Sequence, residues 1–215
     1  MDIYSNCEYN AGFYKACISF SGWLYDIFQS KAPHIIIKNL RNGKVLNDRF
    51  PEIYAMVNIY QDKKSNHSLF DHSLKALQYT HEELGSRAFP PVLMAAFFHD
   101  YGKVFTTGNK FKDHDRIGPI KTELLLSSYK IPAETIKDAK KIMQTHFYAS
   151  QYQREPNWSN DAVIRFIRKS HPFTLEAIAV AKADKMASHN YGPYLVPYDE
   201  LRKRCLDIFK IGVEV

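Results

Sequence analysis

Apolar residues recur along this chain at intervals of three and four positions, whereas strict alternation of apolar and polar residues is rare. The first spacing is that of one face of an α-helix, and alternation is that of a half-buried strand. The single run of β-branched residues, at 35–37, stands alone. We therefore predict an all-α fold, a compact multi-helix domain with helices at residues 11–29, 52–61, 69–84, 91–101, 115–129, 133–148, 160–170, 174–189 and 197–209.

The expected helix at 91–101 has an unusual distribution of polarity. It opens at Pro90-Pro91, and residues 92–98 are apolar on every face until the chain reaches His99 and Asp100. A helix that is apolar all round is expected to be buried in the core. Because an unpaired carboxylate is costly in such a setting, Asp100 needs a partner there, and a metal ion would be a suitable one.

The composition is that of an ordinary globular protein with one sizeable core. The chain has 215 residues with no internal repeat and no linker-like stretch, which predicts one domain. It carries 29 Lys and Arg against 23 Asp and Glu, a net charge of +6, and its isoelectric point is near 9.0. This mild excess is compatible with an anionic partner such as a nucleotide, RNA or a phosphoester.

Cysteine usage and the start of the chain bear on the compartment. Three cysteines, Cys7, Cys17 and Cys205, support neither a disulfide framework nor a cysteine-based zinc site, and they fit a reducing cytoplasm. The longest uncharged run before residue 30 is too short to cross a bilayer, and the start lacks the basic residues of a signal peptide. We expect a cytoplasmic, unprocessed protein without a membrane segment; its oligomeric state stays open.

Histidine and aspartate side chains gather beside the apolar stripes of several expected helices. Four imidazoles and two carboxylates make a mixed nitrogen and oxygen ligand set that suits Mn, Fe, Co, Ni or Zn. Six such ligands can hold two ions bridged by one carboxylate, and Asp100 is the natural bridge. The six candidate metal ligands are His72, His99, Asp100, His114, His146 and Asp184.

Each of these residues also has an ordinary structural interpretation. The His-Asp pair could cap the end of its helix, and Asp184 could pair with Lys182 or Lys185. The other histidines could be surface residues or core residues with satisfied nitrogens. Their context favours the metal site over these alternatives: one His-Asp pair ends a buried helix, the pair that contains His114 opens an expected helix, and the other three residues lie at helical positions.

The order of these residues resembles the HD superfamily of metal-dependent phosphohydrolases, in which a lone His is followed by His-Asp and a distant Asp, all on helices. His72, His99-Asp100 and Asp184 match that order, and the other two histidines match the extra pair of two-metal members. The resemblance implies one or two divalent ions among Mn, Fe, Co, Ni, Zn or Mg. It also implies a single HD-type domain over 1–215, divided into a helical N-terminal extension (1–49), a metal-binding core (50–190) and a C-terminal helix (191–215).

A closer similarity over roughly residues 30–190 is to the HD domain of bacterial CCA-adding tRNA nucleotidyltransferases. The polymerase head of those enzymes is not expected here, because no Gly-Ser strand turn with paired aspartates precedes the match. The similarity implies 2′,3′-cyclic phosphodiesterase, 2′-nucleotidase or phosphatase activity on a nucleotide or RNA-end phosphoester. The motifs that carry it are Phe50-Pro51-Glu52-Ile53, Gln61, His72-Ser73-Leu74, His99-Asp100-Tyr101-Gly102-Lys103, His114-Asp115 with Gly118, and Ile131-Pro132 before His146.

The resemblance also implies catalytic roles for two residues. Asp100 would bridge ions and orient a water, and Lys103 would contact a phosphate, although a plain helix C-cap is the alternative for Lys103. Arg116 and Lys121 join Lys103 as candidate substrate-binding residues. Arg116 and Lys121 belong to a basic cluster that could hold an anionic substrate or simply form a solvated face: Lys110, Lys112, Arg116 and Lys121.

Other features leave the function open in part. Aromatic residues after His146 could stack a base or pack a loop: Phe147, Tyr148, Tyr152 and Trp158. Rival functions are a nucleotide-pool or signalling-nucleotide hydrolase of the HD superfamily, and a non-catalytic RNA-binding protein with that fold. The sequence favours a phosphoester of a nucleotide or RNA end as substrate, with RNA as a possible partner.

Overall fold

The computed structural model describes residues 22–60, 67–106, 111–188 and 192–210. Within these ranges the chain is helical, and its one β-type contact is an isolated bridge between Tyr60 and Ser68. The predicted all-α fold is confirmed. The α-helices are α1 (Trp23–Gln29), α2 (Pro33–Asn42), α3 (Val45–Arg49), α4 (Pro51–Tyr54), α5 (Leu69–Leu84), α6 (Pro90–Phe98), α7 (His114–Ser128), α8 (Ala133–Arg154), α9 (Asn160–Ser170), α10 (Thr174–Ala187) and α11 (Val196–Lys210). The 3₁₀ turns are η2 (Ala55–Asn58), η3 (Gly85–Arg87), η4 (Tyr101–Phe105) and η5 (Gly192–Leu195).

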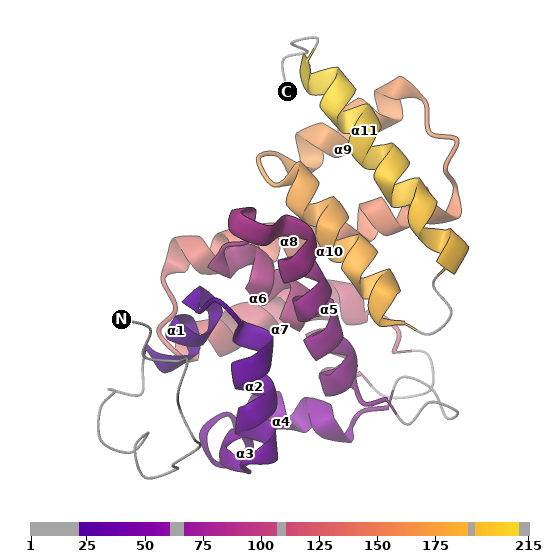
Figure 1. The fold of residues 1–215 in the computed structure, drawn as a ribbon. Helices are drawn as coiled ribbons and strands as arrows, with labels where there is room; N and C mark the ends of the chain where they lie inside the picture. Colours follow the sequence, from indigo (N-terminus) through magenta and orange to yellow (C-terminus); the bar gives the residue numbers. More distant parts are fainter. Residues whose placement is uncertain (1–21, 61–66, 107–110, 189–191, 211–215) are drawn as a thin grey trace.

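The helices are arranged around α6. It packs between α5 and α8, and α10 lies along both of these neighbours (Figure 1). The helix α7 packs against α8 and against the turn η4, which directly follows the end of α6. The short helices α1 to α4 lie at one end of the molecule, and α9 and α11 lie at the other (Figure 1). The end of α6 is therefore surrounded by α5, α7, α8 and α10.

The central position of α6 follows from its sequence. All residues from Pro91 to Phe98 are buried, as expected for a helix that is apolar on every face. The Phe97 ring meets the edge of Phe70 on α5 with centroids 5.9 Å apart, and full burial of one such side chain stabilises the fold by about 1.5–3 kcal/mol. Within the described ranges, no helix is both long enough and apolar enough to span a bilayer.

Two apolar clusters stabilise the described part of the molecule. The larger one surrounds α6 and includes Met94 and Phe98, while the smaller one lies between α9, α11 and the C-terminal part of α8. Both α8 and α10 contribute to each cluster, for example through Met143 in the first and Tyr152 in the second. These two helices therefore connect the apolar cluster around α6 with the α9 and α11 end of the molecule.

The helix α2 was not predicted from the sequence. Its Ile35–Ile37 run has a β-branched, strand-like composition, yet the segment is helical. Pro33 opens it at the first turn, where a proline is well tolerated, and the buried residues Pro33, Ile37 and Leu40 follow helical spacing. Ile35 is 51% exposed. Packing of one face against the core has thus overridden local propensity.

Several predicted boundaries were wrong. The helix expected at 52–61 is α4 followed by a 3₁₀ turn that ends at Asn58, and the helix expected at 91–101 ends at Phe98. The helix expected at 133–148 continues to Arg154, because the first strong stop in the sequence is Pro156. Residues 11–21, Cys7, Cys17 and Gln61 lie outside the described ranges, and Cys205 is buried as a free thiol.

Candidate metal centre

His72 enters the site from the first turn of α5, where several polar contacts hold the helix start. The side chain of Ser68 caps the helix by accepting from the Asp71 N–H at 3.1 Å, and its hydroxyl donates to Asp71 at 2.7 Å. The Arg41 guanidinium pairs with the same carboxylate. Burial raises the pKa of Asp71, but these two partners outweigh it, so the pKa lies below its usual range. Asp71 therefore stays charged and orients the turn that carries His72.

His99 and Asp100 mark the point where α6 stops. His99 is 2% exposed, and its Nδ1–H donates to the carbonyl of Ala96 at 2.8 Å. Asp100 leaves the helical conformation, with φ −104° and ψ 8°, so its carboxylate turns away from the helix axis toward α5 and α7. A fully apolar helix thus ends on two polar groups that must find partners from neighbouring helices.

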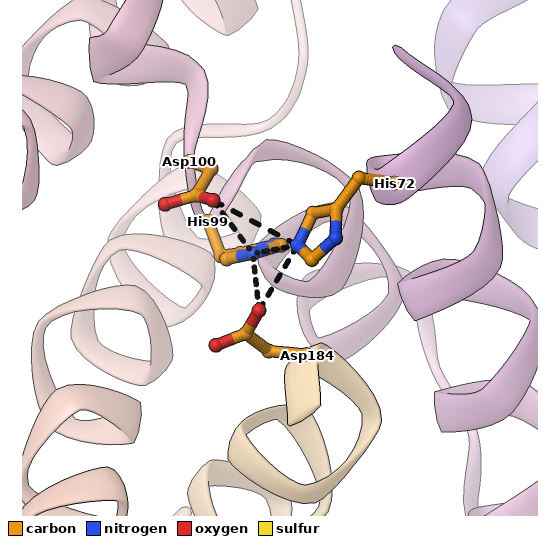
Figure 2. Close-up of side chains that lie close together, drawn as sticks. All are labelled: His72, His99, Asp100 and Asp184. Carbon is orange, nitrogen blue, oxygen red and sulfur yellow. Dashed lines mark hydrogen bonds and ion pairs between the residues drawn. The ribbon is translucent and has the colours of Figure 1, made fainter. Parts of the chain in front are cut away.

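Asp184 completes a tight group of four from α10. Its Oδ1 lies 2.9 Å from Nε2 of His72 and 3.4 Å from Nε2 of His99, and Oδ2 of Asp100 lies 3.4 Å from the same atom of His99. Figure 2 shows these side chains converging from three helices on one point. One ligand atom from each of the four residues lies within 4.8 Å of every other. The alternative pairings of Asp184 are not seen among the described contacts: Lys182 pairs with Glu83 and Asp199, and the ammonium of Lys185 lies over the Tyr194 ring.

His114 approaches the second oxygen of the same carboxylate. Its Nε2 lies 3.2 Å from Oδ1 of Asp100, whereas His99 and Lys103 face Oδ2. The His114 Nδ1–H donates to the carbonyl of Phe111 at 2.7 Å. Asp100 thus has an imidazole nitrogen close to each of its two oxygens, which is the position that a bridging carboxylate would need.

Two glycines allow this approach. A Cβ on Gly102 would lie 2.1 Å from the carbonyl oxygen of His114 and 2.8 Å from the backbone nitrogen of Gly118. A Cβ on Gly118 would in turn lie 3.2 Å from the nitrogen of Gly102. The turn η4 and the start of α7 are therefore in backbone contact, and this contact fixes how far His114 stands from Asp100.

His146 lies next to this group on α8. It is 8% exposed, its Nδ1–H donates to the carbonyl of Met143 at 2.6 Å, and its ring meets the edge of the His99 ring with centroids 5.6 Å apart. It is not one of the four residues whose ligand atoms converge. The structure places it against the His99 ring, without a direct contact to either carboxylate among those described.

Three of the histidines share one pattern of support. The residues His99, His114 and His146 each donate Nδ1–H to a carbonyl three residues earlier in the chain. A carbonyl can only accept, so Nδ1 of each ring carries a proton. In the neutral form of such a ring, the lone pair is on Nε2. Such a second contact is what orients metal-ligating imidazoles in proteins.

The electrostatics of the site fit a bound cation. Burial raises the pKa of Asp100, but the Lys103 ammonium and the His99 ring outweigh it and hold that pKa well below its usual range. Burial lowers the pKa of His99, yet the two carboxylates raise it to about 10. The Nε2 atoms of His72 and His99 are 3.2 Å apart, a distance at which two lone pairs repel unless a proton or a metal ion lies between them. The residues present therefore fit a divalent ion bound by nitrogen and oxygen.

The basic residues are placed less uniformly than expected. Lys103 lies against Asp100, with Nζ 2.5 Å from Oδ2, and its side chain is 12% exposed. Lys121 stacks over the Phe105 ring at 4.9 Å from its centroid. Lys112 and Arg116 are exposed beside the start of α7, and Lys110 lies outside the described ranges. Only Lys103 of these is in contact with the candidate ligands.

Some supporting residues were missed from the sequence. Ser68 and Asp71 are two of these, although Ser-x-x-Asp before an apolar run is a recognisable start of a helix. Phe111, whose carbonyl orients His114, has no such signal, since its role depends on a backbone in the left-handed region (φ 42°).

Comparison with known families agrees with this geometry. The model of the HD domain family matches residues 69–188, which is more than half of the chain and spans the helices from α5 to α10. All six candidate ligands lie within the matched segment. No curated protein matches the chain.

Proposed function

Because the chain belongs to the HD domain family, whose members are in general metal-dependent phosphohydrolases, we propose that it hydrolyses a phosphoester of a nucleotide or RNA end. The observation that carries the proposal is the surrounding of Asp100. One carboxylate faces imidazoles from two directions, and an ammonium group lies in contact with it. Such an arrangement serves phosphoryl chemistry, in which negative charge must be stabilised on several oxygens at once.

The candidate ligands divide into two groups that share Asp100. His72, His99, Asp100 and Asp184 would hold one ion, and Asp100 with His114 and His146 would hold a second. When bound, divalent ions supply Lewis-acid charge that lowers the pKa of a coordinated water and stabilises phosphoryl oxygens. This division is supported by the carbonyl contacts that leave Nε2 of His99, His114 and His146 available as ligand atoms.

Lys103 is the proposed phosphate contact. Its ammonium now neutralises Asp100, and its side chain also lies 5.7 Å from the centroid of the Phe111 ring. A cation held by Asp100 would replace Lys103 as the counter-charge of this carboxylate. The flexible lysine side chain would then allow Nζ to turn toward a phosphate oxygen. Asp100 would accept a hydrogen bond from the attacking water and so orient it.

The substrate class rests on the resemblance to the HD domain of CCA-adding enzymes and on charge. The chain carries a net charge of +6, and Lys112 and Arg116 are exposed next to His114 at the start of α7. An RNA strand that extends from the site in this direction would meet positive charge. We therefore favour 2′,3′-cyclic phosphodiesterase, 2′-nucleotidase or phosphatase activity over hydrolysis of free triphosphates.

A substrate panel tests this assignment. Purified protein is stripped with a chelator, reloaded separately with Mn, Co, Ni, Zn and Mg, and assayed on 2′,3′-cyclic nucleotides, 2′-nucleotides, an oligoribonucleotide with a terminal phosphate, nucleoside triphosphates and deoxynucleoside monophosphates. We expect higher kcat/KM on the first three. His99→Ala should be inactive, and the matched control His171→Ala, which removes an exposed histidine after α9, should keep full activity. Preference for triphosphates or deoxynucleoside monophosphates would overturn the substrate class and favour a nucleotide-pool enzyme.

A further inference from the structure

A second pocket lies away from the metal centre, between α8 and α9. It has a volume of about 380 Å³, within the range of small-ligand sites, and it is lined by Tyr148, Trp158, Ala162, Arg165, Phe166 and Lys169. Tyr148 comes from α8, Trp158 from the connection after it, and the others from α9. In Figure 1 this region is the end of the molecule where α9 and α11 pack.

The aromatic wall of the pocket is held in place by the core beneath it. The Trp158 ring meets Tyr152 with centroids 5.3 Å apart at 88°, and meets Phe166 at 6.1 Å and 64°. Tyr152 and Phe166 are buried, while Trp158 and Tyr148 are partly exposed. Two fixed edge contacts leave little freedom for the indole, so its orientation is set before any ligand arrives.

The charges at the pocket are all of one sign. Lys169 places its ammonium 3.8 Å from the centroid of the Tyr148 ring and hydrogen-bonds to the hydroxyl of the same residue. Arg165 is exposed one turn earlier on α9. No carboxylate is found among the described residues that line the pocket. Flat aromatic faces next to unopposed cations are the combination that binds a base and its phosphates in single-stranded nucleic acids.

From this geometry we infer that the pocket binds one nucleotide unit of a single-stranded nucleic acid. The base stacks on the Trp158 and Tyr148 side, and the neighbouring phosphates contact Arg165 and Lys169. An apolar peptide is a poorer occupant, because it would bring no negative charge to either cation. A free polyphosphate would gain nothing from the aromatic wall.

This pocket is separate from the metal centre. Tyr148 follows His146 by two positions on α8, which places their side chains roughly 200° apart around the helix axis. His146 contacts the His99 ring, whereas Tyr148 contacts Lys169 on α9. Binding at the pocket does not depend on the proposed hydrolase activity, so the two can be tested apart.

Tryptophan fluorescence gives a direct test. The chain has two tryptophans, and Trp23 is buried against Phe50, so a Trp23→Phe variant leaves Trp158 as the only indole. Hexa-adenylate with hydroxyl ends is titrated into this full-length protein in the presence of a chelator, so that no turnover occurs. We expect saturable quenching, because a base stacks on the indole. Absence of quenching would overturn the inference.

Charge variants separate this site from non-specific attraction. Lys169→Gln with Arg165→Gln should reduce the slope of log K against log salt by about 1.4, for two lost phosphate contacts, and so weaken hexa-adenylate binding roughly 25-fold in about 0.1 M salt. Arg168→Gln removes an exposed charge from the same helix without touching the pocket and should leave both unchanged. Three results would each contradict the inference. They are equal effects of the double variant and of Arg168→Gln, equal affinity for a duplex of the same sequence, and competition by tripolyphosphate as strong as that by hexa-adenylate.

Discussion

Replacing Gly102 by Ala is expected to damage the metal centre without touching any candidate ligand. The added Cβ would lie 2.1 Å from the His114 carbonyl oxygen and 2.8 Å from the Gly118 nitrogen. Both neighbours are backbone atoms, so no side-chain rotation relieves the overlap. Since ordinary contact begins at 3.4 Å, η4 and the start of α7 must separate by about 1.3 Å.

The consequence falls on His114. Its Nε2 is 3.2 Å from Oδ1 of Asp100, and a displacement of about 1.3 Å takes it out of hydrogen-bond reach and out of a shared coordination site. Overpacking of this kind costs about 1–3 kcal/mol of unfolding free energy. For a chain of this length the melting temperature should fall by roughly 2–12 °C, at about 2–4 °C per kcal/mol.

Metal content and melting temperature are measured together on four proteins: the unaltered chain, Gly102→Ala, His114→Ala and the double variant. Gly102→Ala should lose the same ion as His114→Ala, and the double variant should lose no more, because both changes remove one ligand. Gly22→Ala is the control, since its Cβ would meet nothing closer than Asp26 at 3.9 Å. Unchanged metal content and melting temperature in Gly102→Ala would refute the role of this backbone contact.

Three further predictions concern the ligands and their charges. Asp100→Ala should abolish turnover and most metal binding, whereas His146→Ala should lose one ion and part of the activity; equal metal content in His146→Ala and the unaltered protein, by elemental analysis, would show that His146 is no ligand. In the metal-free protein the pKa of His99 is raised to about 10, so below that pH metal uptake must release its proton, and apparent affinity should rise with pH. Calorimetry of metal binding in buffers of different ionisation enthalpy should find about one proton released. Metal binding without proton release would contradict the charge state assigned to His99. Lys103→Gln should lower kcat by about 10²-fold or more with metal content retained, while the exposed control Lys203→Gln on α11 keeps its kcat; loss of metal instead of rate would make Lys103 a structural residue.

The sequence predicted the helices best where local signals and packing agree. The helix α5 begins and ends at the predicted residues, because Ser68 caps its start and Gly85 follows its end. The helix α9 likewise begins after the capping residue Ser159. The helix α2 could not be predicted in this way, because its strand-like isoleucines become helical only through packing of one face on the core.

The composition of the site was easier to predict than its arrangement. Residue types and helical positions led to all six candidate ligands, and the structure brings four of them within 4.8 Å of one another. The two-sided contact of Asp100 depends on where α6 stops and on the backbone approach of Gly102 to α7, neither of which leaves a periodic signal. Lys121, a predicted substrate-binding residue, stacks over the Phe105 ring, a neighbour that sequence spacing does not show.

The central claim is that this chain hydrolyses phosphoesters through divalent ions held around Asp100. The most direct test is a titration of Mn into chelator-stripped protein with bis-p-nitrophenyl phosphate as a general phosphodiester, in which bound metal and hydrolysis rate are measured on the same samples. We expect no hydrolysis without metal, a rate that rises in proportion to bound ion, and no recovery in Asp100→Asn. Hydrolysis that persists after the metal is removed, or that recovers equally in Asp100→Asn, would contradict it.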